Sequence, residues 1–421
     1  MAFRGEIRVP GDKSISHRAI LVNAAAGGEW RVRNLLEGED VLRSLELVKR
    51  VGVSVKRERG DYILTSPGRF ALKEPDDIID AGNSGTTVRI GAGLLASVRG
   101  LSVVTGDRYL RKRPMLRVVE PLRRMGALVL GRGGGEFLPL AIEGRSLSGI
   151  EYESPVASAQ VKSCVLLAGL SSNVPVRVRE PVNSRDHTER LMKAMGARVE
   201  VSGTSVALKD SSSVKPVDVD VPGDFSSAAF FIGGALVTPD SEIVVRDVLL
   251  NPHRTGFLSV VSRMGGDVKV ENVREQSGEP VGDIIVRYSP DLRGTVVEES
   301  EIPSLIDEVP ILSVVAVFAG GVTEIRGAGE LRVKESDRIR AMCSNLRLFG
   351  VTVEEKPDGM VIQGGGGTVT PERVSSFGDH RVVMSLEILS RALGKEVQVD
   401  DTTSVRTSFP TFYDILRSVY S

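Results

Sequence analysis

The chain has 421 residues, more than one ordinary core holds, so its length predicts two or three domains. Its 54 Lys and Arg residues balance 55 Asp and Glu residues, and this near-neutral charge argues against a protein that binds nucleic acid or an anionic membrane surface. The longest nearly apolar run begins at Val309 and is shorter than the roughly 18 residues that span a membrane.

Neither a signal peptide nor a metal site is predicted. The first residues lead directly into a strand-like pattern. Cys164 and Cys343 lie in helix-like apolar patterns, and neither the two cysteines nor the four histidines have the spacing of metal ligands. We therefore expect two buried thiols, a reducing cytoplasmic environment and no bound metal.

The first predicted elements are a strand that ends at Pro10–Gly11 and a helix that follows it, within RVPGDKSISHRAIL. Asp12 or Ser14 can cap this helix, and Lys13 stands at its start. A helix start with free N–H groups beside a lysine is suited to an anion. A capped surface helix with solvated charges explains the same residues, so this segment alone leaves both interpretations open.

A helix end followed by a strand then recurs along the chain. Each copy has a glycine where a helix C-terminus favours positive φ, and these are Gly52, Gly126, Gly196, Gly265, Gly350 and, in a weaker copy, Gly394. Between the copies, an extended stretch breaks six times into a helix with a polar start, and two of these stretches share VPGD. The simplest account is an α/β protein of six βα-containing units in two groups of three.

The N-terminal strand has no preceding unit with which to pair, so we expect it to join the C-terminal units. The chain would then cross between domains near Pro10 and again near Pro222. This predicts one discontinuous domain of residues 1–10 plus 222–421 and one continuous domain of residues 11–221. If the units are arranged alike, their helix N-termini can face one cleft suited to a polyanionic small molecule.

Polar residues gather at the next two predicted helix starts. AGNSGTTVR (81–89) offers glycines for close backbone approach and hydroxyl side chains. The loop RYLRKRP that follows is a local basic patch in a nearly neutral protein. In SPVASAQVKS, Ser158 and Gln160 could hydrogen-bond a polyol or a phosphate. Capped turns and a solvated loop remain the alternative for all three segments.

Carboxylates appear where an apolar pattern does not need them. Asp307 and Glu308 interrupt the apolar stretch PSLIDEVPIL, and a buried carboxylate costs several kcal/mol unless it is partnered or catalytic, so one of them is a candidate general base. The segment KESDR (334–338) alternates in sign at a helix start, which a salt-bridged helix face would also explain. Arg381 stands at a helix N-terminus, where it opposes the helix dipole unless an anion meets it.

Taken together and in this order, PGDKSISHR, AGNSGTTVR, RKRP, SAQVKS, the Asp-Glu pair, LRVKESDR and GDHR resemble the enolpyruvyl transferase family over the whole chain, in particular its 5-enolpyruvylshikimate-3-phosphate synthases. The resemblance implies transfer of the enolpyruvyl group of phosphoenolpyruvate to the 5-hydroxyl of shikimate 3-phosphate, with release of phosphate, in the shikimate pathway to aromatic amino acids. It implies two similar domains, each of three βαβαββ repeats in an inside-out α/β barrel, which close on the substrates. No cofactor is implied, and a monomer is expected.

The resemblance also implies residue roles. Asp307 would hydrogen-bond the 5-hydroxyl, Glu335 would protonate the methylene carbon, and Lys334 would stand at the reacting centre. Lys13 would contact both substrates. The implied ligands of shikimate 3-phosphate are Ser14, Arg18, Ser158, Gln160 and Ser184. Arg185 would supply the phosphate contact that is lost where Ala159 replaces a serine of some members. Those of phosphoenolpyruvate are Asn83, Gly85, Thr86, Arg113, Arg338 and Arg381.

Three residues depart from the pattern of some family members: Ala159 replaces a serine, Glu330 an asparagine and Thr407 a lysine. Gly85 is where the family meets the inhibitor glyphosate, and the sequence leaves sensitivity to it open. Two other functions are alternatives to this one. One is the sister transferase that acts on UDP-N-acetylglucosamine, whose usual loop cysteine is missing here. The other is a non-catalytic protein that binds phosphate ligands or RNA ends, which would need neither Asp307 nor Glu335.

Overall fold

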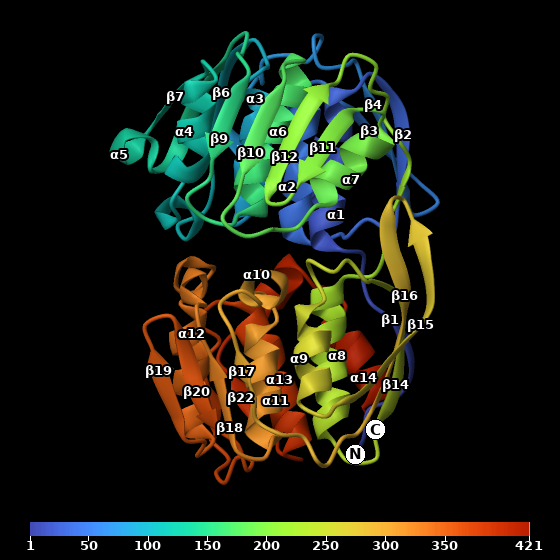
Figure 1. Ribbon diagram of the computed structural model, residues 1–421, viewed down its shortest axis with the longest axis vertical. Coiled ribbons are helices and arrows are strands. Elements are labelled where there is room, and N and C mark those ends of the chain that lie inside the picture. Colours follow the sequence, from blue (N-terminus) through green and yellow to red (C-terminus); the bar gives the residue numbers. More distant parts are fainter. Residues whose placement is uncertain (421) are drawn as a thin grey trace. The chain divides into compact units, whose positions relative to one another are not determined.

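The protein consists of two α/β units (Figure 1), seen here in a computed structural model that describes residues 1–420. Unit 1 comprises Met1–Pro10, Pro222–Glu275 and the chain from Pro280 onward. Unit 2 comprises Gly11–Val221 together with the four residues Gln276–Glu279. Each unit has its own buried core and is built from the same repeating pattern of elements.

Unit 2 contains three four-stranded sheets of one design, in which the first two strands pair in parallel and the others antiparallel. The first sheet, in spatial order, consists of β13 (Val219–Asp220), β2 (Gly28–Arg33), β4 (Asp61–Ser66) and β3 (Ser54–Glu58). The second consists of β5 (Ile79–Asp80), β6 (Gly100–Thr105), β8 (Phe137–Gly144) and β7 (Leu128–Gly131). The third consists of β9 (Ile150–Glu153), β10 (Val176–Arg179), β12 (Ser205–Asp210) and β11 (Arg198–Ser202).

The main helices of unit 2 alternate with these strands. They are α1 (Lys13–Leu21), α2 (Glu39–Arg50), α3 (Gly85–Leu95), α4 (Leu116–Arg124), α6 (Ala159–Ser172) and α7 (His187–Ala194). The chain therefore runs strand, helix, strand, helix and two strands in each repeat, with only the short α5 (Arg132–Gly135) added. Helices α3 and α6 are buried along most of their length and pack closely on each other, because both are apolar on nearly every face.

Unit 1 repeats the design with a shortened last copy. Its first sheet consists of β1 (Arg4–Arg8), β14 (Glu242–Leu249), β16 (Glu279–Arg287) and β15 (Asp267–Gln276). The second consists of β17 (Val296–Val297), β18 (Val322–Ile325), β20 (Gly359–Gln363) and β19 (Val353–Lys356). The third has only β21 (Arg373–Val374) and β22 (Gln398–Val399). The sixth copy thus lacks the closing hairpin that three full repeats in this unit would have given.

The inner helices of unit 1 form its core. These are α8 (Phe225–Val237), α11 (Val309–Phe318) and α13 (His380–Ala392), which pack on one another. Every residue of α8 is buried. Outer helices are α9 (Gly256–Arg263), α12 (Arg338–Leu348) and the short α10 (Ile302–Leu305). In place of a last hairpin, α14 (Phe412–Val419) follows, and Phe412 stacks on Phe230 and Phe231 of α8.

The two units have exchanged their first strands. β1 precedes α1 in the chain but pairs in parallel with β14 of unit 1, Arg4 beside Glu242. β13 precedes α8 in the chain but pairs in parallel with β2 of unit 2, Val219 beside Val32. The chain passes from one unit to the other at the two VPGD turns, between Pro10 and Gly11 and between Val221 and Pro222.

The predicted helix ends are confirmed by the backbone. The six repeat glycines all have positive φ, from +65° at Gly394 to +103° at Gly126. A residue with a Cβ atom rarely adopts this conformation, which is why the glycine marks the turn from helix to strand in every copy.

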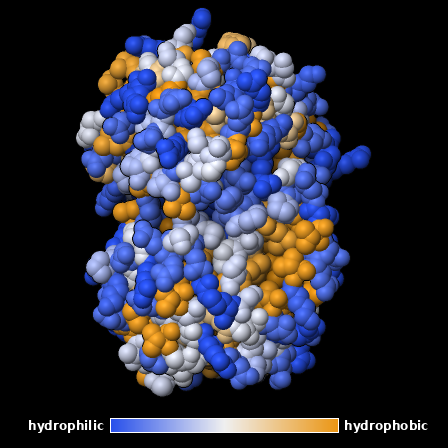
Figure 2. Space-filling model, viewed as in Figure 1, coloured by the Kyte–Doolittle hydropathy of each residue, from blue (hydrophilic) through white to orange (hydrophobic). Residues whose placement is uncertain are grey.

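The surface and the helices of residues 1–420 fit a sequence with many charged residues and only short apolar runs. Figure 2 shows hydrophilic residues over much of the visible face of each unit, with smaller apolar patches among them. None of the helices in this part of the chain is both long and apolar enough to cross a membrane. Cys164 and Cys343 are both buried free thiols, as predicted.

Candidate active site

Helix α1 begins with a capped turn that carries the predicted lysine and serine. Asp12 is the cap: its carboxylate accepts a hydrogen bond from the backbone N–H of Ile15 at 2.8 Å. Lys13 is half-buried and its ammonium group pairs with the carboxylate of Asp40 on α2. The turn therefore holds a cation at a helix N-terminus, which is the arrangement that favours an anion.

Arg18, one turn further along α1, is only 3% exposed and is held by three parts of unit 2. Its guanidinium donates to Thr188 Oγ1 at 2.7 Å, to Ser163 Oγ at 2.8 Å and to the backbone oxygen of Ser14 at 3.0 Å. Burial lowers its pKa to about 10, so it remains a cation at neutral pH. Arg185 donates to Ser14 Oγ at 3.4 Å, which brings Ser14, Arg18 and Arg185 together.

The start of α3 forms a second cluster in unit 2. A Cβ atom built on Gly85 would lie 3.1 to 3.3 Å from the guanidinium of Arg113, so this guanidinium lies almost against the glycine. Thr86 Oγ1 accepts a hydrogen bond from the side-chain amide of Gln160 at 3.0 Å, and Arg89 donates to the other end of that amide at 2.8 Å. Of the predicted basic loop, Arg108, Arg111 and Lys112 are exposed.

Asn83 stands just before α3 and donates to Asp107 Oδ2 at 2.9 Å. The amide of Gln160 connects the start of α3 with the start of α6, where Ser158 is the N-cap and accepts from the N–H of Val161 at 3.4 Å. The predicted residues Asn83, Gly85, Thr86, Arg113 and Gln160 therefore occupy neighbouring positions at two helix starts of unit 2.

Ser158 and Ser184 are joined by a residue that the sequence prediction missed. Glu180 accepts from the backbone N–H of Ser158 at 2.8 Å and from the hydroxyl of Ser184, also at 2.8 Å. Glu180 follows the last residue of β10, an inner strand of its sheet. Ser184 lies only four residues further along the chain, but the contacts of Glu180 with Ser158 and Lys162 depend on the packing of β10 and α6, which the local sequence does not show.

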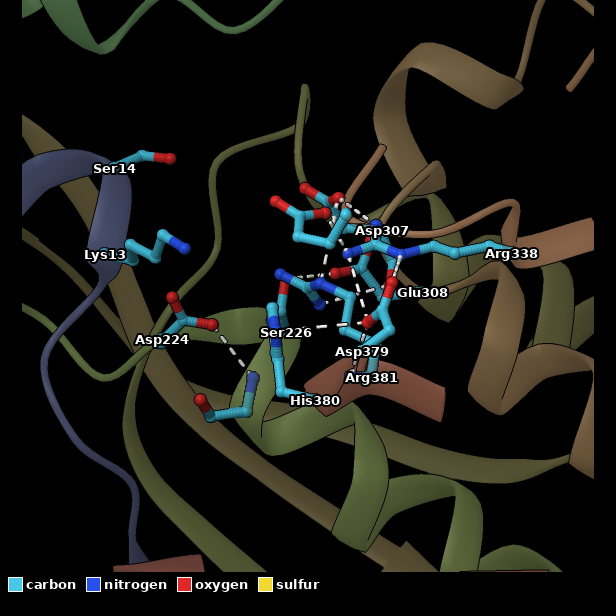
Figure 3. A network of polar contacts seen from close by, with 12 residues as sticks. Lys13, Ser14, Asp224, Ser226, Asp307, Glu308, Arg338, Asp379, His380 and Arg381 are labelled. Atoms are coloured by element: carbon cyan, nitrogen blue, oxygen red, sulfur yellow. Dashed lines mark hydrogen bonds and ion pairs between the residues drawn. The ribbon is translucent and has the colours of Figure 1, made fainter. Parts of the chain in front are cut away.

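In unit 1, Asp307 lies between α10 and α11 within a group of arginines (Figure 3). Its carboxylate lies 3.2 Å from Arg338, 3.5 Å from Arg254 and 3.8 Å from Arg381. Arg381 also donates to the backbone oxygen of Asp307 at 3.1 Å. The carboxyl of the predicted general base thus lies among three guanidinium groups, with its side chain 15% exposed.

Arg338 is the centre of this group. It is 1% exposed and, besides Asp307, it contacts Glu335 at 2.6 Å and Asp379 at 2.8 Å. Burial acts to lower the pKa of Arg338, but the three carboxylates outweigh it and raise the pKa above the ordinary value. Burial likewise acts to raise the pKa of Asp379, and Arg338 outweighs it, so the pKa is lowered and Asp379 is an anion.

Lys334 and Glu335 follow η3 (Gly329–Val333) directly, and both are partly buried. Burial lowers the pKa of Lys334, although Asp307 opposes this shift. Arg381 is the second residue of α13, whose cap Asp379 accepts from the N–H of Arg381 at 2.9 Å. A cation at a helix N-terminus is unfavourable by itself, so the carboxylates around Arg338 and Arg381 offset that cost.

A second carboxyl of the Asp-Glu pair lies deeper in unit 1. Glu308 is 1% exposed and accepts a short hydrogen bond from Ser226 of α8 (Figure 3). Arg254 donates to the same hydroxyl at 2.8 Å. Burial raises the pKa of Glu308 above its ordinary value. Arg254, which lies in the loop before α9, was not predicted. The one indication of it in the sequence is that an arginine stands directly before an apolar helix pattern.

Within each unit the predicted residues therefore come together. Unit 2 collects hydroxyls, an amide and guanidinium groups at helix starts, which suits phosphate and hydroxyl groups of a ligand. Unit 1 collects two partly exposed carboxyls, Asp307 and Glu335, on one guanidinium, with Lys334 and Arg381 nearby. Two carboxyls beside fixed cations can move protons to and from a bound substrate.

Comparisons with known proteins agree over the full chain. The family model described as EPSP synthase (3-phosphoshikimate 1-carboxyvinyltransferase) matches residues 1–416. A 3-phosphoshikimate 1-carboxyvinyltransferase of Syntrophotalea carbinolica is 51% identical over 417 residues, 99% of this chain and 96% of the relative. One from Geobacter sulfurreducens is 49% identical over 418 residues, 99% of this chain and 97% of the relative.

Two solved structures are also similar to this chain over nearly its whole length. The EPSP synthase of Acinetobacter baumannii superposes with a TM-score of 0.88 and 40% identity, covering 100% of this chain and 96% of that one. The enolpyruvyl transferase NikO of Streptomyces tendae superposes with a TM-score of 0.77 at 14% identity, covering 99% of this chain and 95% of that one. The second likeness concerns the fold alone.

Proposed function

Because this chain belongs to the EPSP synthase family, we propose that it transfers the enolpyruvyl group of phosphoenolpyruvate to the 5-hydroxyl of shikimate 3-phosphate and releases phosphate. The observation that carries the proposal is the match to curated relatives of this activity along 99% of the chain. It is joined by the site itself, where Asp307 and Glu335 share the guanidinium of Arg338.

We propose that unit 2 supplies the ligands of the phosphate groups. Ser14, Arg18 and Arg185, which lie together at α1, would hold shikimate 3-phosphate. Ser158, Gln160 and Ser184 would hold its ring and phosphate oxygens. Gly85 supports a role at the phosphate of phosphoenolpyruvate, because only a residue without Cβ leaves the Arg113 guanidinium where it lies. Asn83 and Thr86 would complete that set.

The carboxylate of phosphoenolpyruvate needs planar cations that reorganise little on binding. Arg338 and Arg381 meet this need, because Asp379, Asp307 and Glu335 already fix their guanidinium groups. We propose that both hold the carboxylate, and that the ammonium groups of Lys13 and Lys334 stabilise charge that develops during the reaction.

The proposed reaction needs one acid and one base. Glu335 gives its proton to C3 of phosphoenolpyruvate, which builds positive character at C2. The 5-hydroxyl attacks C2 while Asp307 accepts its proton, and the C–O bond that forms gives a tetrahedral adduct. In the second half, the Glu335 carboxylate takes a proton back from C3 as the C2=C3 double bond forms and the C2–O bond to phosphate breaks. The proton held by Asp307 passes to the departing phosphate, so both carboxyls return to their starting states. Arg338 contacts both carboxyls, so one guanidinium group fixes the positions of the acid and the base relative to each other.

The test is phosphate release by the purified protein with phosphoenolpyruvate and shikimate 3-phosphate. A parallel reaction replaces shikimate 3-phosphate with UDP-N-acetylglucosamine. We expect release only with the shikimate ester. Release only with the nucleotide sugar would assign the chain to the sister reaction, and no release with either would overturn the proposed activity.

Three further expectations rest on this function. We expect the enzyme to work as a monomer, which sedimentation of the purified protein tests. We expect it to need no metal or organic cofactor, which metal analysis of the active enzyme tests for the metal. We also expect it in the cytoplasm, which fractionation of cells that contain the protein tests.

A further inference from the structure

Unit 2 contains a buried cluster of three charged residues that the proposed reaction does not use. The ammonium group of Lys162 on α6 lies 3.0 Å from Glu180 Oε2 and 2.8 Å from Glu189 Oε1 of α7. The side chains of Lys162, Glu180 and Glu189 are 3%, 1% and 3% exposed. A buried ion cluster is weak evidence for stability, because apolar residues of the same volume often serve as well. A role for the cluster therefore follows from its contacts with other residues.

The two glutamates differ in those contacts. Glu180 accepts from the backbone N–H of Ser158, from the hydroxyl of Ser184 with both carboxylate oxygens and from the N–H of Ser184. Glu189 has its ion pair with Lys162, and its Oε2 has no hydrogen-bond partner anywhere in residues 1–420. Of the two glutamates, Glu180 therefore connects the cap of α6 with the loop that carries Ser184, and Lys162 adds a hydrogen bond from α6 to the backbone oxygen of Ser184 at 3.3 Å.

Lys162 places a positive charge beside the carboxylate of Glu180. Burial acts to lower the pKa of Lys162, but Glu189 and Glu180 outweigh it, so the pKa is raised and the lysine stays charged. The carboxylate of Glu180 is thus neutralised on its buried side. On its other side it accepts hydrogen bonds from the backbone N–H of Ser158 and from the hydroxyl of Ser184.

We propose that Glu180 is a positioning residue for shikimate 3-phosphate. It fixes the backbone position of Ser158 and the hydroxyl direction of Ser184, and Lys162 is its counter-ion. This inference rests on the proposed function, in which both serines contact that substrate. It assigns Glu180 no contact with the reacting atoms, so its loss acts on the binding of one substrate and not on that of the other.

The test compares Glu180→Gln with the matched control Glu189→Gln. Both substitutions remove one buried negative charge beside Lys162, and only the first removes a carboxylate that holds the serines. We expect Glu180→Gln to raise both the Kd and the KM for shikimate 3-phosphate at least about tenfold, the effect of losing one charge-assisted hydrogen bond. The KM for phosphoenolpyruvate should stay within about twofold. Glu189→Gln should raise the Kd for shikimate 3-phosphate clearly less than Glu180→Gln does, because the charge of Glu189 acts on Arg18 but its carboxylate holds neither serine.

A purely structural role makes a different prediction. In Glu180→Gln the new amide donor faces the ammonium of Lys162, and replacing that lysine as well, in Glu180→Gln with Lys162→Met, removes the conflict. We expect the double variant to recover thermal stability while the Kd for shikimate 3-phosphate stays raised. Recovery of the Kd together with stability, an equal effect of Glu189→Gln, or a parent-like Kd in Glu180→Gln would each overturn the proposal.

A further variant keeps the test decisive if Glu180→Gln folds poorly. Ser184→Ala leaves the ion cluster intact and removes the hydroxyl that Glu180 holds. If Glu180 acts through this serine, the effects of the two substitutions on the Kd must be non-additive; additive effects contradict the proposal. The parent enzyme separates this inference from the proposed function: a parent that releases phosphate with shikimate 3-phosphate retains its function even if Glu180 proves irrelevant.

Discussion

At the scale of single residues, Arg338 positions the proposed acid and base, because it contacts both Asp307 and Glu335. We expect Asp307→Ala and Glu335→Gln each to lower turnover at least about 100-fold, the usual contribution of a positioned acid or base. Steady-state phosphate release measures this. Glu301→Gln, which removes a carboxylate paired with Arg263 elsewhere in unit 1, is the control and should retain parent turnover. Parent-like turnover in either site variant would contradict the assignment.

Gly85 makes a prediction about one substrate. The methyl group in Gly85→Ala would lie 3.1 Å from the nearest atom of the Arg113 guanidinium, tighter than an ordinary contact, so Arg113 must move. We expect the KM for phosphoenolpyruvate to rise about tenfold, a cost of one weakened charge-assisted contact, with the KM for shikimate 3-phosphate nearly unchanged. Gly320→Ala is the control, because its Cβ would meet only the backbone oxygen of Leu292 at 3.6 Å. Equal rises in both KM values would reject this role.

Glu308 predicts a pH dependence of stability. Its pKa is raised by burial, so above its ordinary value of 4.5 the unfolded chain releases a proton that the folded chain still holds. The free energy of unfolding contributed by Glu308 is therefore fully present below that value and lost as pH rises through the folded pKa. Glu308→Gln cannot titrate, so its stability relative to the parent should increase between about pH 5 and 8.

Urea unfolding at several pH values measures this trend. Glu301→Gln should show no comparable trend above about pH 5, because Arg263 lowers the pKa of Glu301 and this carboxyl stays ionised there in both states. A relative stability of Glu308→Gln that is flat or falls with pH would show that Glu308 is an anion in the folded protein.

At the scale of elements, the helix starts carry both the fold and the candidate site. Asp224 caps α8, accepting from the N–H of Ser227 at 2.8 Å, as Asp12 caps α1. We expect Asp224→Ala to lower the free energy of unfolding by about 1 kcal/mol and Asp224→Asn by less, because asparagine is as good a cap as aspartate. Chemical denaturation measures both. Equal losses would mean that the charge of Asp224, and not its capping, stabilises the protein.

How much the sequence predicts is also clearest at this scale. Polar helix starts and C-terminal glycines are local signals, and they predicted the α/β class, the repeats and the family, all of which are confirmed. The shortened sixth repeat was missed because nothing before Gly394 indicates that two strands will not follow. Arg254 was missed because its partner Asp307 is distant in sequence. Glu180 was missed because, although Ser184 is four residues away, its contacts with Ser158 and Lys162 arise only from the packing of β10 and α6.

At the scale of the whole molecule, the exchanged strands predict unequal independence of the units. Residues 11–221 contain every strand of the three sheets of unit 2, including β13. Residues 222–421 lack β1, whose segment buries Phe3, Ile7 and Val9 in the core of unit 1. We expect the first fragment to unfold cooperatively when it is made alone, and the second to require residues 1–10 for the same behaviour.

Circular dichroism during urea titration of each fragment tests this, with a fragment in which residues 1–10 are joined by a flexible linker to residue 222 as the control. Cooperative unfolding of residues 222–421 without that segment would show that β1 contributes little to its unit. The four residues Gln276–Glu279, which group with unit 2, are absent from the first fragment, and their loss should lower its stability. Glu279 lies 2.7 Å from His187, Gly278 accepts from Arg190 at 3.0 Å, and Ser277 accepts from the N–H of Asp220 at 2.9 Å.

The exchange of β1 and β13 also bears on ancestry. The two VPGD turns stand at equivalent places, each after a strand that completes the sheet of the other half and before a helix capped by its aspartate. A half-length chain that begins with such a strand and places it outside its own first sheet must receive the matching strand from a second copy. The present gene thus has the form expected of a domain-swapped homodimer whose two subunits were fused end to end, with the swap preserved as covalent crossings.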